Sequence, residues 1–282
     1  EFFSASMTMD ISNQNKLSEF YEELKRLNIK IQRPDINKCF ADFKSKDNIF
    51  YYALGAVKNV GFEAVSNIVK ERLNGGVFSS LNNFINRINP KDINKLQLEG
   101  LVKAGAFDDL NTNRKEIYET IPKLILKSKN VYENKINNQI NLFNIDDEND
   151  EVKNTFEDWK FDERLSKEFE SLGFFISDHP LNEYSEILEN YDIYNFTDFK
   201  DNLNISEANI AATILKIQEK KTQKGNSYAI VKFSDRKTVF ELFIFSDLLE
   251  MNREFLKEGF SFIITVIKNM TDENNRFKRF NV

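Results

Sequence analysis

The segment Leu54–Glu63 carries the clearest arrangement of residues for binding an anion. Its sequence, Leu-Gly-Ala-Val-Lys-Asn-Val-Gly-Phe-Glu, predicts a short helical turn, a hairpin containing glycine and the start of a second helix. The first N–H groups of a helix have no partner within it, and the helix dipole favours negative charge there, so this hairpin could hold a phosphate. Lys58 and Lys70 would add positive charge. A glycine-terminated turn packed in a core has the same pattern, so both interpretations stay open.

This segment resembles the helix-hairpin-helix motif, which binds the nucleic-acid backbone without reading the base sequence. The motif usually has glycine two residues before Gly61, where this chain has Asn59. Asn tolerates the left-handed backbone conformation better than other non-glycine residues, so we expect Asn59 to adopt it. On this interpretation the DNA-binding residues here are Lys58, Asn59, Val60, Gly61 and Lys70.

A second candidate is the short apolar island Gln139-Ile140-Asn141-Leu142-Phe143, which interrupts a polar and acidic stretch. Leu142 and Phe143 would each gain about 1.5–3 kcal/mol on full burial in a pocket of a partner, and the amide of Gln139 would make directed hydrogen bonds. The pattern resembles the peptide with which bacterial polymerases and repair proteins bind the sliding clamp. The alternative is a patch that packs back on its own domain.

From about Asn209 the apolar pattern alternates with a period of two. Three strands, a helix (247–258) and two further strands are expected, which is the order of a five-stranded OB-type barrel. Near its first turn lie Lys220, Lys221 and Lys224, with Tyr228 on the next strand. Lysines beside an aromatic ring can hold single-stranded DNA by phosphate contacts and base stacking, although Tyr228 could equally be half-buried core.

Other kinds of site are not expected. The single cysteine, Cys39, and the single histidine, His179, exclude a disulfide framework and a Cys/His zinc site. His179 lies between Asp178 and Pro180, which is typical of a helix entry. The dense acidic run 146–151 falls in a linker-like stretch rather than on a rigid scaffold. We therefore expect no catalytic residue, metal site or cofactor in this chain.

Composition and charge suggest several units. Residues 129–200 contain 7 Lys and Arg against 18 Asp and Glu, a net charge of −11, whereas the flanking segments have net charges of +3 and +2. Either flank could therefore face phosphates. We expect a multidomain α+β chain with a helical part at 1–128, an acidic linker carrying the apolar island at 129–160, a short helical segment at 161–200, and an all-β OB-type barrel at 201–282 that is truncated in its last strand. No apolar run suits a membrane helix, and we expect a cytoplasmic protein.

Five motifs occur in the order in which they occur in the alpha-subunit family of bacterial DNA polymerase III, and the resemblance covers essentially the whole chain. They are Glu1–Ala5, Arg33–Asn37, Gly55–Gly61, Leu98–Asp108 and Leu172–Leu181. The fourth contains Leu-Glu-Gly-Leu-Val-Lys-Ala-Gly-Ala-Phe-Asp, and the fifth reads Leu-Gly-Phe-Phe-Ile-Ser-Asp-His-Pro-Leu. The chain departs from the family with Arg33 for a proline, Asn59 for a glycine and Phe175 for a tyrosine.

The resemblance implies the end of the fingers with tandem helix-hairpin-helix elements on duplex DNA, then a clamp-binding peptide, then an OB domain near single-stranded template. It implies a parent nucleotidyltransferase that uses Mg²⁺ held by carboxylates of a palm domain before Glu1, so this fragment alone should be inactive. The implied partners are duplex DNA, template DNA, the sliding clamp (beta subunit) and other replisome subunits, and the implied function is processive chromosomal DNA synthesis. Alternatives are an error-prone paralogue, a free-standing OB module for single strands, and a helical interaction scaffold.

Overall fold

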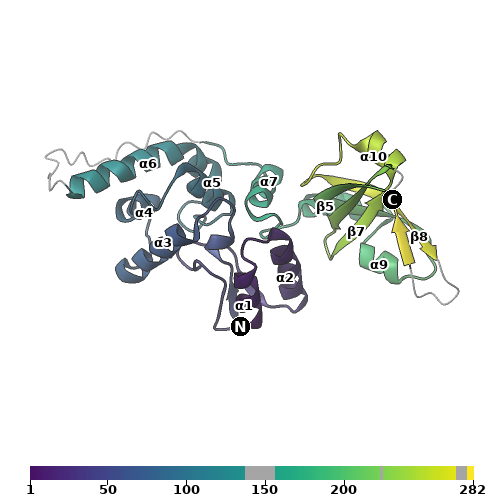
Figure 1. Cartoon of the computed structure of the whole chain (residues 1–282), viewed down its shortest axis with the longest axis horizontal. Helices are drawn as coiled ribbons and strands as arrows, with labels where there is room; N and C mark the ends of the chain where they lie inside the picture. Colours follow the sequence, from purple (N-terminus) through teal and green to yellow (C-terminus); the bar gives the residue numbers. More distant parts are fainter. Residues whose placement is uncertain (137–155, 223–224, 271–277) are drawn as a thin grey trace. The chain divides into compact units, whose positions relative to one another are not determined.

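The structure is a computed structural model that describes residues 1–136, 156–222, 225–270 and 278–282 (Figure 1). The chain divides into two compact units, Glu1–Ser177 and Asp178–Val282, and each is described by itself. The segment 161–200, which the sequence suggests as one short helical part, therefore contributes residues to both units. None of the described helices is both long and apolar enough to cross a membrane.

The first unit is mainly helical, and a small sheet with strand order β1-β3-β2 joins its helices. Its elements are α1 (Phe2–Met9), α2 (Gln14–Arg26), β1 (Lys30–Gln32), β2 (Lys44–Lys46), β3 (Ile49–Tyr51), η1 (Leu54–Ala56), α3 (Phe62–Gly75), α4 (Leu81–Arg87), α5 (Lys95–Lys103), α6 (Arg114–Ile136) and α7 (Phe161–Leu172). The apolar residues of α2, α3, α5, α6 and α7 recur at helical spacing, and this periodicity marks these helices in the sequence. It missed α4, which has only seven residues and begins at a serine cap, Ser80.

The core of the first unit explains one of the sequence motifs. Gly105 follows α5 with φ +78°, a left-handed conformation that suits glycine, and so reverses the chain. The reversal brings Phe107 into the core, where its ring lies 5.2 Å from that of Phe84, which in turn lies 5.0 Å from Phe78. Both α4 and α5 pack against the long helix α6 (Figure 1). The Gly-Ala-Phe-Asp run is therefore a turn that closes the core behind the hairpins.

The second unit contains a curled mixed sheet with strand order β4-β5-β6-β7-β9-β8. Its elements are η2 (Pro180–Tyr184), α8 (Ser185–Glu189), β4 (Ile193–Tyr194), α9 (Phe196–Asp201), β5 (Glu207–Lys221), β6 (Ser227–Ser234), β7 (Val239–Ile244), α10 (Ser246–Asn252), β8 (Ser261–Met270) and β9 (Lys278–Asn281). An additional β5–β8 pairing joins the two sides of the sheet. This arrangement is consistent with the predicted OB-type fold.

The long strand β5 makes the curling possible. Its first half, to Thr213, pairs with β8, and its second half pairs with β6. The register shifts between Ile214 and Lys216, and such a bulge bends a strand strongly. The helix expected at 247–258 is shorter in the structure and ends at Asn252. The Asn252 side chain donates to the Leu248 carbonyl, a local bond that competes with continuation of the helix.

Candidate nucleic-acid interface

The first hairpin links η1 to α3 through Val57–Gly61 (Figure 1). Val57 and Val60 are buried and fix the hairpin to the core, whereas Lys58 and Asn59 between them are exposed. Asn59 has φ +65°, so the expectation that it replaces glycine in the left-handed conformation is confirmed. The tip of the hairpin therefore presents one basic and one amide side chain to solvent.

The backbone of this hairpin is held rigidly from two sides. The Lys58 N–H donates to the Ser171 carbonyl at 2.9 Å, so the end of α7 supports the tip. Gly100 of α5 lies against the other side, because a Cβ atom there would come within 2.6 Å of the Lys58 carbonyl oxygen. A larger residue at Gly100 would force the two elements apart. The hairpin is thus preorganised rather than shaped by a ligand.

The helix that follows, α3, begins at Gly61 without a side-chain cap. The N–H groups of Phe62, Glu63 and Ala64 therefore donate no hydrogen bond to a capping side chain, and Gly61 itself is exposed. A Cβ atom at Gly61 would meet only the Gln97 amide nitrogen, at 3.3 Å. Uncapped N–H groups at an accessible helix N-terminus, next to a lysine, can bind an oxyanion such as a backbone phosphate.

A second hairpin joins α4 to α5, and the sequence reasoning had not identified its residues. Lys91-Asp92-Ile93-Asn94 repeats the pattern of Lys58-Asn59-Val60-Gly61, which is the signal that could have revealed it. Here the helix start is capped. The Asn94 side chain accepts the Gln97 N–H at 2.9 Å, and the Gln97 side chain accepts the Asn94 N–H at 2.9 Å, which is a capping box.

Lys70, the fifth residue predicted at the first hairpin, lies farther along α3. It is exposed, but it lies eight positions after Phe62, which corresponds to about 12 Å along the helix axis at about 1.5 Å per residue. The structure therefore brings Lys58, Asn59, Val60 and Gly61 together and leaves Lys70 two turns away.

In the second unit, the pairing register of β5 and β6 shows which of the predicted DNA-binding residues lie on the same face of the sheet. Lys220 lies directly opposite Tyr228, so both side chains are on one face of the sheet. Lys221 lies opposite Ser227 and points to the other face. Lys224 is outside the described residues. Lys220 and Tyr228 are thus the pair that could act together on a ligand.

Phe243 on β7 extends this face, and sequence reasoning had missed it. Its ring stacks on that of Tyr228, with centroids 6.4 Å apart and an interplanar angle of 28°, and it is 44% exposed. Phe243 alternates with buried Leu242 and Ile244, and this alternation already marks it as a solvent-facing residue. Two adjacent aromatic rings beside a lysine are a suitable platform for unstacked bases.

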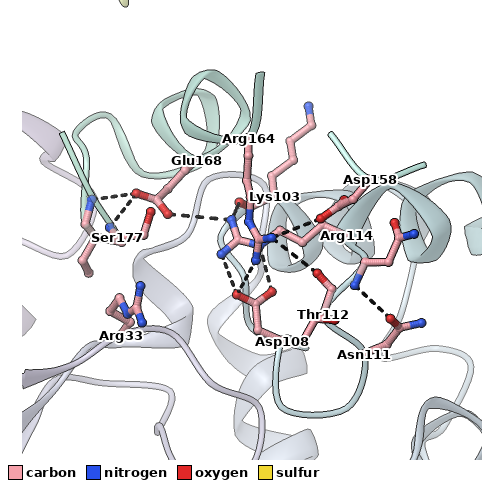
Figure 2. A network of polar contacts seen from close by, with 12 residues as sticks. Arg33, Lys103, Asp108, Asn111, Thr112, Arg114, Asp158, Arg164, Glu168 and Ser177 are labelled. Atoms are coloured by element: carbon pink, nitrogen blue, oxygen red, sulfur yellow. Dashed lines mark hydrogen bonds and ion pairs between the residues drawn. The ribbon is translucent and has the colours of Figure 1, made fainter. Parts of the chain in front are cut away.

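A network of charged side chains joins Asp108, Arg114, Arg164 and Asp158 (Figure 2). Asp108 receives two hydrogen bonds from Arg114, at 2.8 and 2.7 Å, and one from Arg164 at 3.1 Å, and Arg164 also bonds Asp158. Burial alone would lower the pKa of Arg114, but the hydrogen bonds that Arg114 donates to Asp108 and the charges of Asp108 and Glu168 raise it. The network ties the turn after α5 to α6 and α7.

Two further predictions concern the clamp-binding peptide and the presence of a metal ion. The clamp-binding residues Gln139, Ile140, Asn141, Leu142 and Phe143, together with the acidic run, lie outside the described residues. Among the residues that are described, no group of three or more His, Cys, Asp or Glu side chains is placed to hold a metal ion.

Comparisons with known proteins agree with this geometry. A family model described as a helix-hairpin-helix motif matches residues 28–117, which include both hairpins. The chain is 33% identical over 285 residues to DNA polymerase III subunit alpha of Borreliella burgdorferi, covering 98% of this chain and 24% of that protein. The subunit of Caulobacter vibrioides is 31% identical with the same coverage, and that of Vibrio cholerae is 26% identical over 99% of this chain.

The chain spans about a quarter of the length of these relatives. The match nevertheless runs through both compact units rather than through the hairpins alone. The chain is therefore homologous over nearly its whole length to DNA polymerase III alpha subunits, and it fits a fragment of such a subunit.

Proposed function

We propose that this chain is the DNA-binding part of a replicative DNA polymerase III alpha subunit and that its first hairpin holds duplex DNA by the backbone. The observation that carries the proposal is the exposed, uncapped start of α3 at Gly61, with Lys58 and left-handed Asn59 beside it. It lies within the segment that matches the helix-hairpin-helix model. Backbone N–H groups contact phosphates, so such binding is independent of base sequence.

In the whole polymerase, the proposed activity is nucleotide transfer with Mg²⁺, which would stabilise the charge of the transferred phosphate. The contribution that we propose for this chain is to position DNA. Lys58 and the N–H groups of α3 would hold the duplex. Lys220, Tyr228 and Phe243 would hold unpaired template bases by charge and stacking.

A further part of the proposal is attachment to the sliding clamp and, through the parent, to other replisome subunits. The sequence Gln139-Ile140-Asn141-Leu142-Phe143 supports it, because two apolar side chains beside a glutamine suit a pocket-binding peptide. Tethering would make rebinding to DNA intramolecular and so raise processivity. Replacing Leu142 and Phe143 together by alanine should abolish clamp binding in a titration and leave duplex affinity unchanged. Equal clamp affinity of variant and parent would remove this assignment.

The DNA-binding proposal is tested by fluorescence anisotropy of the 282-residue chain with labelled duplexes of two unrelated sequences. Both duplexes should bind with the same affinity. The logarithm of the association constant should fall linearly with the logarithm of salt concentration, with a slope of about −0.9 per phosphate contacted. A slope near zero would contradict the proposal and favour a protein-interaction scaffold, whereas strong preference for one sequence would exclude backbone binding.

A further inference from the structure

The chain passes from the first compact unit to the second between Ser177 and Asp178, inside the motif Ser-Asp-His-Pro-Leu that DNA binding leaves unexplained. On the first side, the fully buried Glu168 of α7 holds the chain. Its Oε1 atom accepts the N–H groups of Ile176 at 2.7 Å and of Ser177 at 2.9 Å (Figure 2). The last residues of the first unit are therefore fixed to its body.

A buried carboxylate is stable there because a buried cation faces it. The Glu168 Oε2 atom has no hydrogen-bond partner, but it lies 3.7 Å from Arg114 Nη1. Arg114 is itself held by Asp108 and by the Lys103 carbonyl, which accepts from its Nη1 at 3.0 Å. The carbonyl of Ile176 also accepts a hydrogen bond from the Tyr21 hydroxyl at 3.2 Å. The anchor is thus built into the core and is not a surface contact.

On the second side, His179 holds the chain to the barrel unit. Its Nδ1 atom accepts the Leu181 N–H at 3.2 Å, which confirms the predicted helix entry. An accepting Nδ1 leaves the proton of the neutral ring on Nε2, which lies 3.2 Å from the Ser234 hydroxyl on β6. Asp178 accepts the His179 N–H at 2.7 Å, so it belongs to the same anchor.

We propose that the Ser177–Asp178 peptide is a hinge between the two units, delimited by Glu168 on one side and by His179 on the other. Both anchors lie directly against the boundary, so the backbone dihedral angles that neither anchor holds are those of this one link. Glu168 is a positioning residue, since it acts through the backbone of Ile176 and Ser177. The hinge does not depend on the proposed DNA function.

Hydrogen exchange on the 282-residue chain tests the first anchor. Replacing Glu168 by alanine should raise the exchange rates of the Ile176 and Ser177 amides by about tenfold or more, since each factor of ten corresponds to about 1.4 kcal/mol. Glu168→Gln retains one carbonyl oxygen and should give a smaller increase. Glu170→Ala is the matched control, because Glu170 is on the same helix but exposed, with ion pairs to Lys103 and Lys167. It should leave both amides unchanged.

Distance distributions between two spin labels test the hinge itself. Asn130→Cys and Asn204→Cys place labels at exposed positions of the two units. The natural Cys39 should not react, because burial raises the pKa of its thiol to about 12. Releasing Ile176 and Ser177 from Glu168 adds two residues to the link, and so up to about 7 Å of reach at about 3.5 Å per residue, while the buried Phe174 and Phe175 stay in the core. Glu168→Ala should broaden the distribution accordingly, and Glu170→Ala should not.

Different results of these two experiments would overturn the hinge proposal for different reasons. A Glu168→Ala distribution as narrow as that of the parent, with fast exchange at Ile176 and Ser177, would show that the anchor does not limit the motion. Exchange raised evenly throughout the first unit would show that Glu168 only stabilises the fold. If Glu168→Ala does not fold, Glu168→Gln is compared with Glu170→Ala instead. Equal spin-label distance distributions in these two variants would reject the proposal.

Discussion

The two hairpins of the first unit share the pattern of a lysine, a short polar residue, a buried branched residue and a helix start. They differ at the residue where the helix begins. Gly61 leaves the first N–H groups of α3 without a side-chain cap, whereas Asn94 and Gln97 cap those of α5 reciprocally. The same supersecondary unit therefore occurs once with its anion-binding groups accessible and once with them already satisfied.

This difference teaches that repetition of a motif does not imply repetition of its function. A capping box satisfies two donors within the chain, so a phosphate at α5 would have to displace a hydrogen bond that already exists. At α3 a phosphate would supply a bond that the chain lacks. We therefore expect the first hairpin to carry the DNA affinity and the second to carry stability. Paired substitutions at the two helix starts separate these roles.

The largest effect is expected for Gly61→Ala on duplex binding. Gly61 has φ −73° and ψ 133°, which alanine adopts without strain. The new methyl group would lie 3.3 Å from the Gln97 amide nitrogen, so this side chain, whose oxygen belongs to the capping box of α5, must shift by a few tenths of an ångström. The fold should therefore persist. The methyl group would occupy the space in front of the α3 N–H groups, and hydrogen bonds to charged groups contribute about 1.5–3 kcal/mol each. Anisotropy titration should show duplex affinity reduced about 10- to 100-fold.

The matched control is a thermal unfolding curve of Gly61→Ala. The expected outcome is a midpoint close to that of the parent, which would assign the lost affinity to the hairpin surface. Unchanged duplex affinity in this variant would instead mean that α3 does not contact the phosphate backbone. That result would also weaken the contrast between the hairpins, because neither would then bind DNA.

The second prediction concerns the capped helix start, where we expect a loss of stability and little change in DNA affinity. Asn94→Ala removes the cap of α5, and loss of a helix N-cap costs about 0.5–2 kcal/mol. Denaturant unfolding should show a free energy lower by about 1 kcal/mol, while duplex affinity should stay within about twofold of the parent at the same salt concentration. A marked loss of DNA affinity in a folded Asn94→Ala chain would show that the second hairpin also binds the backbone.

Much of this contrast was accessible from sequence in principle, but only part of it was predicted. The hairpin at Val57–Gly61 was found because glycine and asparagine mark a turn, and Asn59 has the expected left-handed conformation. The second hairpin was missed because α4 is short and Pro90 with Asn94 conceals the glycine pattern. That one hairpin is capped and the other is not follows from single side chains, which apolar periodicity does not register.

The second unit shows a different limit of prediction from sequence. Alternation with a period of two predicted β5, β6, β7 and β8. In β7 this alternation matches the burial of one face, whereas β5 buries six consecutive residues, 210–215. The partner of Tyr228 depends on strand order and register, which bring Phe243 of β7 beside it. The register also places Lys220 and Lys221 on opposite faces, although both lie beside the same turn in the sequence. The lysines near the β5–β6 turn therefore predicted a DNA-binding site, but the sequence did not show which of them share a sheet face with Tyr228.

The smallest expected effect concerns the lysines at corresponding positions of the two hairpins, Lys58 and Lys91. Each is exposed, so neither substitution should alter the fold. If Lys58 neutralises one phosphate, Lys58→Ala should make the slope of log affinity against log salt less negative by about 0.9, with a modest loss of affinity at low salt. Lys91→Ala should leave the slope unchanged, since the helix behind Lys91 is capped. Equal changes in slope for the two variants, measured with the same duplex, would show that both hairpins contact DNA. Capping of the helix start would then not determine which hairpin binds the phosphate backbone.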